Sequence, residues 1–294
     1  MKIHSVAWGW TLTPEDMPVG DSLIDIADGV KALGFDGVDY LSTRESLDEY
    51  FTQPVCEKIK RHLAAIGLDA GGFVFQSDEW NNPDKTAGEL QLAYFAKCAR
   101  AASWIGAPII SCIIPRPFGS KPTRGNASPS EKQTFNLPKG YSYQADWDRF
   151  ASSLDKACGI AADYGITIAL ECFPKSLCST PHAMIQIVND IDRPNFGIQL
   201  DTAHLMNQRL DVETTIYQLG ADRIKHLHCK DSDGLTRGNL PAGSGLVDYT
   251  RVFDVLEDIG YKGRASVEVE FTDNPARYMK QALDHLKLCL ARGY

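Results

Sequence analysis

The chain has 294 residues, of which 44% are hydrophobic, and its formal net charge is −8 at pH 7. This length and hydrophobic content suit a globular protein with a substantial core. The acidic balance argues against a non-specific nucleic-acid binder, which would carry a basic footprint, although a few local cations could still hold a small anionic substrate.

The sequence gives no sign of export or of a membrane span. The N-terminal MKIHSVAWGW lacks the continuous apolar stretch of a signal peptide, and no run of about 18 apolar residues occurs. The cysteines form no C-x-x-C pair, so we expect reduced thiols and a soluble, cytoplasmic protein without membrane partners. The eight cysteines are Cys56, Cys98, Cys112, Cys158, Cys172, Cys178, Cys229 and Cys289.

Short apolar segments alternate with helical patterns along the chain. Several predicted helices end at a glycine that suits a C-cap, and three begin near a proline. Strands are expected at 2–8, 36–41, 68–75, 107–114, 166–172, 196–201, 223–229 and 264–271. Helices are expected at 21–33, 54–66, 86–105, 146–164, 180–190, 211–220, 248–259 and 275–292.

Eight strand–helix units in a chain of this length predict an α/β fold, a single (β/α)8 TIM barrel domain over residues 1–294. A doubly wound sheet would use fewer strands, and no G-x-G-x-x-G follows the first one. Residues 115–143 interrupt the alternation and are rich in Pro, Gly, Ser and Lys. This long insertion after the fourth strand is either an active-site lid or a mobile loop.

The last four predicted strands carry ligand-type side chains at or near their C-terminal ends, where TIM barrels place their chemistry. Each of these residues alone is typical of a helix cap, an ion pair or a satisfied core histidine. Together they predict a divalent-cation site, because unpaired buried carboxylates are costly and carboxylate and imidazole donors suit such an ion. The residues are Glu171, Asp201, His228 and Glu268.

Five stretches resemble the xylose-isomerase-like barrel superfamily of sugar isomerases and epimerases, which also includes nucleases of the endonuclease IV type. The resemblance covers most of the chain. It implies that Glu171, Asp201, His228 and Glu268 bind one divalent metal, usually Mn2+, with Mg2+, Co2+ or Zn2+ as alternatives. It also implies a homodimer or homotetramer. The stretches are GFDGVDY (34–40), YGITIALECFP (164–174), FGIQLDTAH (196–204), HLHCKD (226–231) and IGYKGRASVEVE (259–270).

By this resemblance, Glu171 and Glu268 would also be the catalytic acid and base on opposite faces of a keto-sugar or keto-polyol. The metal would polarise the carbonyl and stabilise the enediolate formed by proton abstraction beside it. His204, one turn after Asp201, would contact a substrate oxygen. The small carbohydrate is the expected partner, and no nucleic acid is expected.

The sequence departs from the ketose 3-epimerases at two positions. Those enzymes carry a glutamate where this chain has Leu177 and an arginine where it has Gly234. Lys230 instead follows the ligand histidine, a pattern that suits inosose isomerases and dehydratases. It could protonate a leaving hydroxyl, hold a substrate oxygen, or simply pair with Asp231 or another carboxylate. A metal-dependent dehydratase or lyase acting on a keto-polyol or 3-keto-glycoside is therefore the alternative.

The nuclease branch is disfavoured, because Arg237 and Asn239 stand where its extra zinc ligands would be expected. Two further residues are candidates for substrate binding. Trp8 could stack on a sugar face or belong to the core, and Arg116 could bind a carboxylate or phosphate or lie at the surface. His226 is expected to point away from the barrel interior and to be structural.

Overall fold

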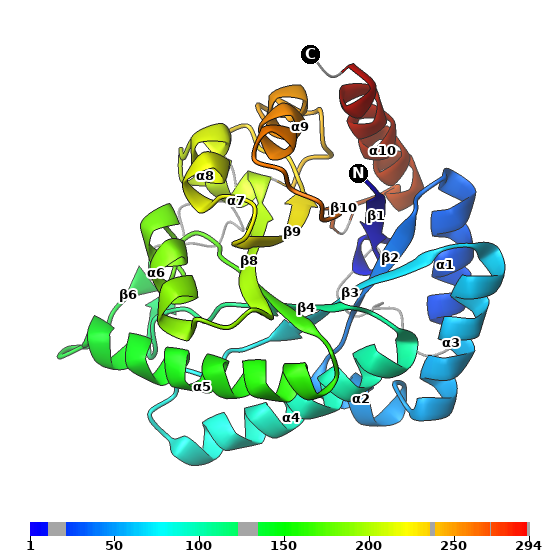
Figure 1. Cartoon of the computed structure of the whole chain (residues 1–294). Helices are drawn as coiled ribbons and strands as arrows, with labels where there is room; N and C mark the ends of the chain where they lie inside the picture. The colour runs from blue at the N-terminus through cyan, green and yellow to red at the C-terminus, as the bar shows by residue number, and fades with distance from the viewer. Residues whose placement is uncertain (11–21, 123–134, 236–238, 271, 293–294) are drawn as a thin grey trace.

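The computed structural model describes residues 1–10, 22–122, 135–235, 239–270 and 272–292. Within these residues, eight parallel strands close into a barrel in the order β1-β10-β9-β8-β7-β4-β3-β2, and helices surround it (Figure 1). The predicted (β/α)8 fold is confirmed. The barrel strands are β1 (Ile3–Val6), β2 (Gly37–Leu41), β3 (Asp69–Gln76), β4 (Ile109–Ile113), β7 (Thr167–Glu171), β8 (Phe196–Asp201), β9 (Ile224–Cys229) and β10 (Ala265–Val267).

The helices begin and end close to their predicted bounds, because the same local signals act in the fold. Pro54 and Pro181 occupy first-turn positions of their helices, and α10 begins at Pro275. Gly67 ends α3 with a φ of 65°, a left-handed conformation that suits glycine. The helices are α1 (Ser22–Leu33), α2 (Arg44–Glu49), α3 (Gln53–Ile66), α4 (Lys85–Ile105), α5 (Tyr143–Asp163), α6 (Pro181–Ile191), α7 (Thr202–Asn207), α8 (Val212–Leu219), α9 (Tyr249–Asp258) and α10 (Pro275–Arg292).

Short elements escaped the sequence prediction. They are a 3-10 turn at Trp8–Trp10, the six-residue helices α2 and α7, and the small hairpin of β5 (Lys121–Pro122) and β6 (Phe135–Asn136). Such elements are too short to show a hydrophobic period. The two short helices begin at side-chain caps, Thr43 for α2 and Asp201 for α7. None of the helices that the structure describes is long and apolar enough to span a bilayer.

The insertion at 115–143 is tied down near both ends by one buried carboxylate. Asp146, in the first turn of α5, accepts hydrogen bonds from the backbone N–H of Phe118 at 2.8 Å and from the Tyr141 hydroxyl at 2.9 Å. Arg149 pairs with the other oxygen of Asp146 at 3.1 Å. Residues 123–134, the middle of the predicted lid, lie outside the described residues, so its role as a lid stays a prediction.

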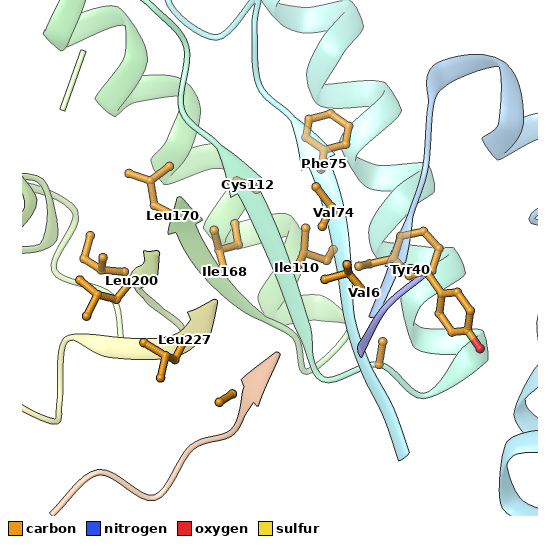
Figure 2. Packing of buried hydrophobic residues seen from close by; sticks show 14 of the residues in the cluster. Val6, Tyr40, Val74, Phe75, Ile110, Cys112, Ile168, Leu170, Leu200 and Leu227 are labelled. Atoms are coloured by element: carbon orange, nitrogen blue, oxygen red, sulfur yellow. The ribbon is translucent and has the colours of Figure 1, made fainter. Parts of the chain in front are cut away.

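The main core lies between the barrel and its helices. Phe75, Cys112 and Leu170 are neighbours in register on β3, β4 and β7 and are buried among other apolar side chains (Figure 2). Phe95 of α4 packs edge-on against Phe75, with the ring centroids 5.2 Å apart. Burial of side chains of this size stabilises the fold by about 1.5–3 kcal/mol each.

The alternate positions of the same strands face the barrel interior and carry polar groups. In register, Glu171 on β7 pairs with Gln199 on β8, and Asp201 on β8 pairs with His228 on β9. His228 in turn pairs with Ser266 on β10. Because side chains alternate between faces, this row brings polar side chains from neighbouring strands into one buried space.

Candidate metal centre

Four strand ends deliver the predicted ligand residues to one place. Glu171 ends β7, Asp201 ends β8, His228 is the penultimate residue of β9, and Glu268 directly follows β10. Each offers one ligand atom, and these atoms all lie within 4.8 Å of one another. All four residues are buried. Register alone therefore gathers three carboxylates and an imidazole at the C-terminal mouth of the barrel.

Asp201 is both a helix cap and a member of this cluster. Its Oδ1 accepts the backbone N–H of His204 at 2.8 Å and so begins α7. Its Oδ2 is buried and has no hydrogen-bond partner among the described residues. Burial raises the pKa of the Asp201 carboxyl, with the nearby Glu268 and Glu171 adding to the rise and His204 and Lys230 opposing it.

Glu268 is held at both of its oxygens. Oε2 lies 2.7 Å from His228 Nδ1, and Oε1 accepts from the Lys230 ammonium at 3.0 Å. Burial would raise the pKa of the Glu268 carboxyl, but the charges of Lys230 and His228 outweigh burial and hold that pKa well below its usual range. Glu268 is therefore a carboxylate, even though it is buried.

His228 carries the complementary shift. Burial alone would lower the pKa of its imidazole, but the carboxylates of Glu268 and Glu171 outweigh burial and raise that pKa to about 9. Without a metal, the ring is a cation at neutral pH and pairs with the acids around it. A metal ion would have to displace that proton to bind His228, since only the neutral imidazole is a ligand.

Glu171 is held less tightly than Glu268. Its Oε1 lies 3.4 Å from His204 Nε2 and 3.9 Å from His228 Nδ1. No described residue donates a hydrogen bond to its Oε2. His204 presents a buried Nδ1 that also has no partner among the described residues. Burial would lower the pKa of His204, but Asp201 and Glu171 outweigh it and raise that pKa.

These residues fit a divalent cation. Three buried carboxylates so close together repel one another, and Lys230 and the imidazolium of His228 offset only part of their charge. The buried Oδ2 of Asp201 lacks a donor, which is costly unless another group satisfies it. Oxygen donors with one imidazole suit a hard or borderline ion, and the donor set does not choose among Mn2+, Mg2+, Co2+ and Zn2+.

Lys230 pairs with carboxylates of the centre, not with Asp231. Besides Glu268, its ammonium lies 3.4 Å from Glu270 Oε1. Asp231 instead accepts the backbone N–H groups of Gly243 and Val247, at 2.9 Å and 3.0 Å. Lys230 therefore holds Glu268, and Asp231 organises the loop before α9.

Three residues of this site were not predicted from the sequence. Gln199 Nε2 lies 3.2 Å from His228 Nδ1, and Ser111 donates a short hydrogen bond to Gln199 Oε1. Glu270 joins through Lys230. Gln199 lies two residues before Asp201 and Glu270 two after Glu268, so the period of two along a strand was the signal that could have found both.

The expectation that His226 points away from the barrel interior is wrong. His226 Nε2 lies 3.2 Å from Asp39 Oδ2 and 3.1 Å from Ser266 Oγ, inside the barrel. Its ring meets that of His228 edge-on, with centroids 5.3 Å apart. Residues two apart on a strand share a face, so His226 must lie on the same side as His228.

Asp39, His226 and His228 also form a second cluster of metal-type ligands. Here, however, hydrogen bonds already use the Asp39 oxygens. Oδ1 accepts the N–H of Gly72 at 2.7 Å, and Oδ2 accepts the Ser266 hydroxyl at 2.5 Å. Burial would raise the pKa of Asp39, but His226 and His4 outweigh it and hold that pKa well below its usual range. This layer of Asp39, His226 and Ser266 lies beneath the centre and contacts it where the ring of His226 packs against that of His228.

The two softer candidates lie at different depths. Trp8 is buried, and its ring centroid is 6.2 Å from that of His228. Arg116 is exposed and stacks on Phe173, with the guanidinium carbon 4.9 Å from the ring centroid. Phe173 in turn lies 6.3 Å from the ring of His204. Trp8 is therefore beside the centre, whereas Arg116 is one aromatic ring removed from it.

The chain belongs to the family described as xylose isomerase-like TIM barrel, whose sequence model matches residues 27–289. An uncharacterized protein of Methanocaldococcus jannaschii is 35% identical over 126 residues, covering 41% of this chain and 43% of the relative. The L-ribulose-5-phosphate 3-epimerase UlaE of Escherichia coli is 28% identical over 147 residues, covering 49% and 51%. The chain thus spans about half the length of the curated relatives it matches.

Solved structures share the fold over nearly the whole chain. The D-psicose 3-epimerase of Clostridium cellulolyticum H10, solved with D-tagatose, superposes with a TM-score of 0.78 at 17% identity and covers 99% of each chain. The IolI protein, solved with a bound zinc atom, superposes with a TM-score of 0.73 at 17% identity and covers 100% of this chain and 99% of its own. At this identity the likeness concerns the fold.

Proposed function

We propose that this protein is a divalent-metal-dependent isomerase or epimerase of a keto-sugar or keto-polyol, which moves a proton beside a carbonyl. The observation that carries the proposal is the buried cluster of Glu171, Asp201, His228 and Glu268 at the C-terminal mouth. The family supports it, as do relatives that act on L-ribulose 5-phosphate and on D-psicose. A divalent cation held there would supply a Lewis acid that makes the proton beside a substrate carbonyl more acidic.

Glu171 and Glu268 would transfer the protons. For an epimerisation, one carboxylate removes the proton from the carbon beside the carbonyl, and the other carboxyl returns a proton to the opposite face. Lys230 keeps Glu268 ionised and oriented. Glu171, with Oε2 free of described donors, has the more accessible oxygen.

His204 would orient the substrate. Its Nε2 faces Glu171 and Asp201 at 3.4 Å and 3.8 Å, which leaves the buried Nδ1 for a hydroxyl or carbonyl oxygen of the sugar. Trp8, close to His228, would offer an apolar surface to a sugar face. Arg116 would contact only the outer end of a longer or anionic substrate.

The test combines metal analysis with proton exchange. Protein purified without chelators should contain about one divalent ion per chain, and ketoses incubated with it in deuterated water should gain deuterium beside the carbonyl. Glu268→Gln should abolish this exchange while circular dichroism remains unchanged. Normal exchange by Glu268→Gln would show that Glu268 does not transfer the proton. A product that has lost water would instead identify the dehydratase or lyase.

A further inference from the structure

The N-terminal mouth of the barrel, at the opposite end from the metal centre, contains a hollow of about 690 Å³. We call it the lower hollow. Its volume lies within the range of about 300–1,000 Å³ found for small-molecule sites. The polar side chains that line it come from the first residues of strands and from the turns before them: Lys2, Asp69, Thr167, Lys225, Lys262 and Arg264.

Positive charge dominates this hollow. Four of the lining side chains are cations, and the only carboxylate among them is Asp69, which Lys2 already binds at 2.5 Å. A surplus of three positive charges therefore faces one concave space, in a chain whose net charge is −8. Charges of one sign in a concave space repel one another and attract ions of the opposite sign.

Two features direct Lys225 into the lower hollow. The pairing of β8 and β9 contains a bulge, because Ile198 pairs with Ile224 while Gln199 pairs with His226, which leaves Lys225 as the extra residue. Gly197 makes room for its stem, since a Cβ there would lie 2.6 Å from Lys225 Cγ and 2.4 Å from the backbone oxygen of Arg223. A larger residue at 197 would displace this lysine.

The turn before β10 is held in shape and presents two more cations. The Tyr261 hydroxyl donates to the backbone oxygen of Arg264 at 3.0 Å. A Cβ at Gly263 would lie 2.2 Å from that same hydroxyl oxygen, so the arrangement requires glycine. Arg264 is half-buried and donates to the backbone oxygen of Ala70 at 3.3 Å, while Lys262 is exposed.

Other lysines at this end of the barrel have structural partners. Lys31 donates to the backbone oxygen of Gly67 at 2.8 Å, and Lys287 donates to that of Gly34 at 2.7 Å, so both satisfy carbonyls just beyond helix ends. In the part of the chain that the structure describes, Lys225 and Lys262 have no hydrogen bond or ion pair. Capping of helix ends therefore does not account for these two cations.

We propose that the lower hollow binds a small oxyanion with two or more negative charges, of which inorganic phosphate is the simplest. Lys225 and Lys262 supply free ammonium donors, and Arg264 supplies the remaining donors of its guanidinium. This site is separate from the proposed sugar chemistry and does not depend on it.

The test is calorimetric titration of inorganic phosphate into the metal-containing protein at low ionic strength. Lys225→Met keeps an apolar stem over Gly197 and removes the charge, so we expect phosphate binding to weaken about tenfold, the loss of one charge-assisted hydrogen bond. Lys262→Met should weaken binding less, because this side chain is exposed. Lys156→Met, the same change at an exposed position of α5, is the matched control and should bind like the wild type.

Two results would overturn the proposal: wild-type protein that does not bind phosphate, or Lys225→Met and Lys156→Met that bind it equally, which would place the anion elsewhere, including the metal centre. Thermal unfolding shows whether Lys225→Met is folded, and Lys262→Met carries the test if it is not. Ketose exchange should be unchanged in Lys225→Met. Loss of phosphate binding with intact exchange would thus separate this site from the proposed catalytic one.

Discussion

At the C-terminal mouth of the barrel, three carboxylates and an imidazole lie buried with ligand atoms within 4.8 Å of one another, whereas at the N-terminal mouth four cations surround an open hollow of about 690 Å³. The upper group comes from strand ends and is fixed by register. The lower group depends on a bulge and a turn. Buried opposite charges hold the upper group together, so changes there should affect chemistry and stability far more than changes below.

After Glu268→Gln, the largest expected effect is that of Glu171→Gln at the upper mouth. The amide keeps the shape but cannot accept a proton, so the rate of ketose exchange should fall by about 10³-fold. Exchange rates measure the loss of activity, and denaturant unfolding shows separately whether stability has changed. Glu89→Gln, an exposed change on α4, is the control. A Glu171→Gln enzyme within tenfold of the wild type would show that Glu171 does not transfer the proton.

Lys230→Met should change stability strongly. The substitution leaves the buried Glu268 and the neighbouring Glu270 without their shared cation, and the free energy of unfolding of the metal-free protein should fall by about 3 kcal/mol. Urea denaturation after chelation measures this loss. Lys97→Met removes an exposed pair with Asp48 and should cost less than about 1 kcal/mol. Equal losses in the two variants would contradict the difference between buried and exposed pairs.

Asp39→Asn tests the polar layer beneath the centre. The amide cannot accept all the hydrogen bonds that Ser266, Gly72 and His226 direct at the carboxylate, so the free energy of unfolding should fall by about 2 kcal/mol. Asp163→Asn, at the exposed end of α5, should be nearly neutral. If Asp39→Asn left the free energy of unfolding unchanged, this layer would fill space without stabilising the barrel.

The smallest effect is expected at the lower mouth. Lys225→Met should change the free energy of unfolding by less than about 0.5 kcal/mol, because its ammonium has no partner among the described residues. Denaturant midpoints in phosphate-free buffer provide the measurement. A loss of several kcal/mol would show that Lys225 is part of the stabilising structure, and the contrast between the two mouths would then fail.

Strand period and helix signals predicted much of this molecule. The segment 196–201 is a strand over the same residues, 275–292 is a helix over the same residues, and the four predicted ligand residues meet at one mouth. The contact between Lys230 and Glu268 was beyond the sequence, because strand register decides which residues meet. The lower hollow was also hidden, since its cations come from separate segments of the chain.

Two errors had different causes, one a short element and the other the period of two along a strand. Helix α7 was not predicted, because it is only six residues long and shows no hydrophobic period; it begins at the Asp201 cap. The orientation of His226 was misjudged although Glu171 and Asp201 were placed on the correct strand ends. Residues two apart share a face, so placing His228 in the cluster should also have placed His226 inside the barrel.

The bulge at Lys225 accommodates one extra residue in strand β9. Ile224 faces the helices and His226 and His228 face the barrel axis, because the bulge takes up the residue between Ile224 and His226. Deleting Lys225 would therefore remove the bulge but not the register, because Ile224 and His226 would become adjacent residues on opposite faces and His228 would keep its place in the cluster. The extra residue thus gives the lower mouth a cation without changing which side chains reach the upper one.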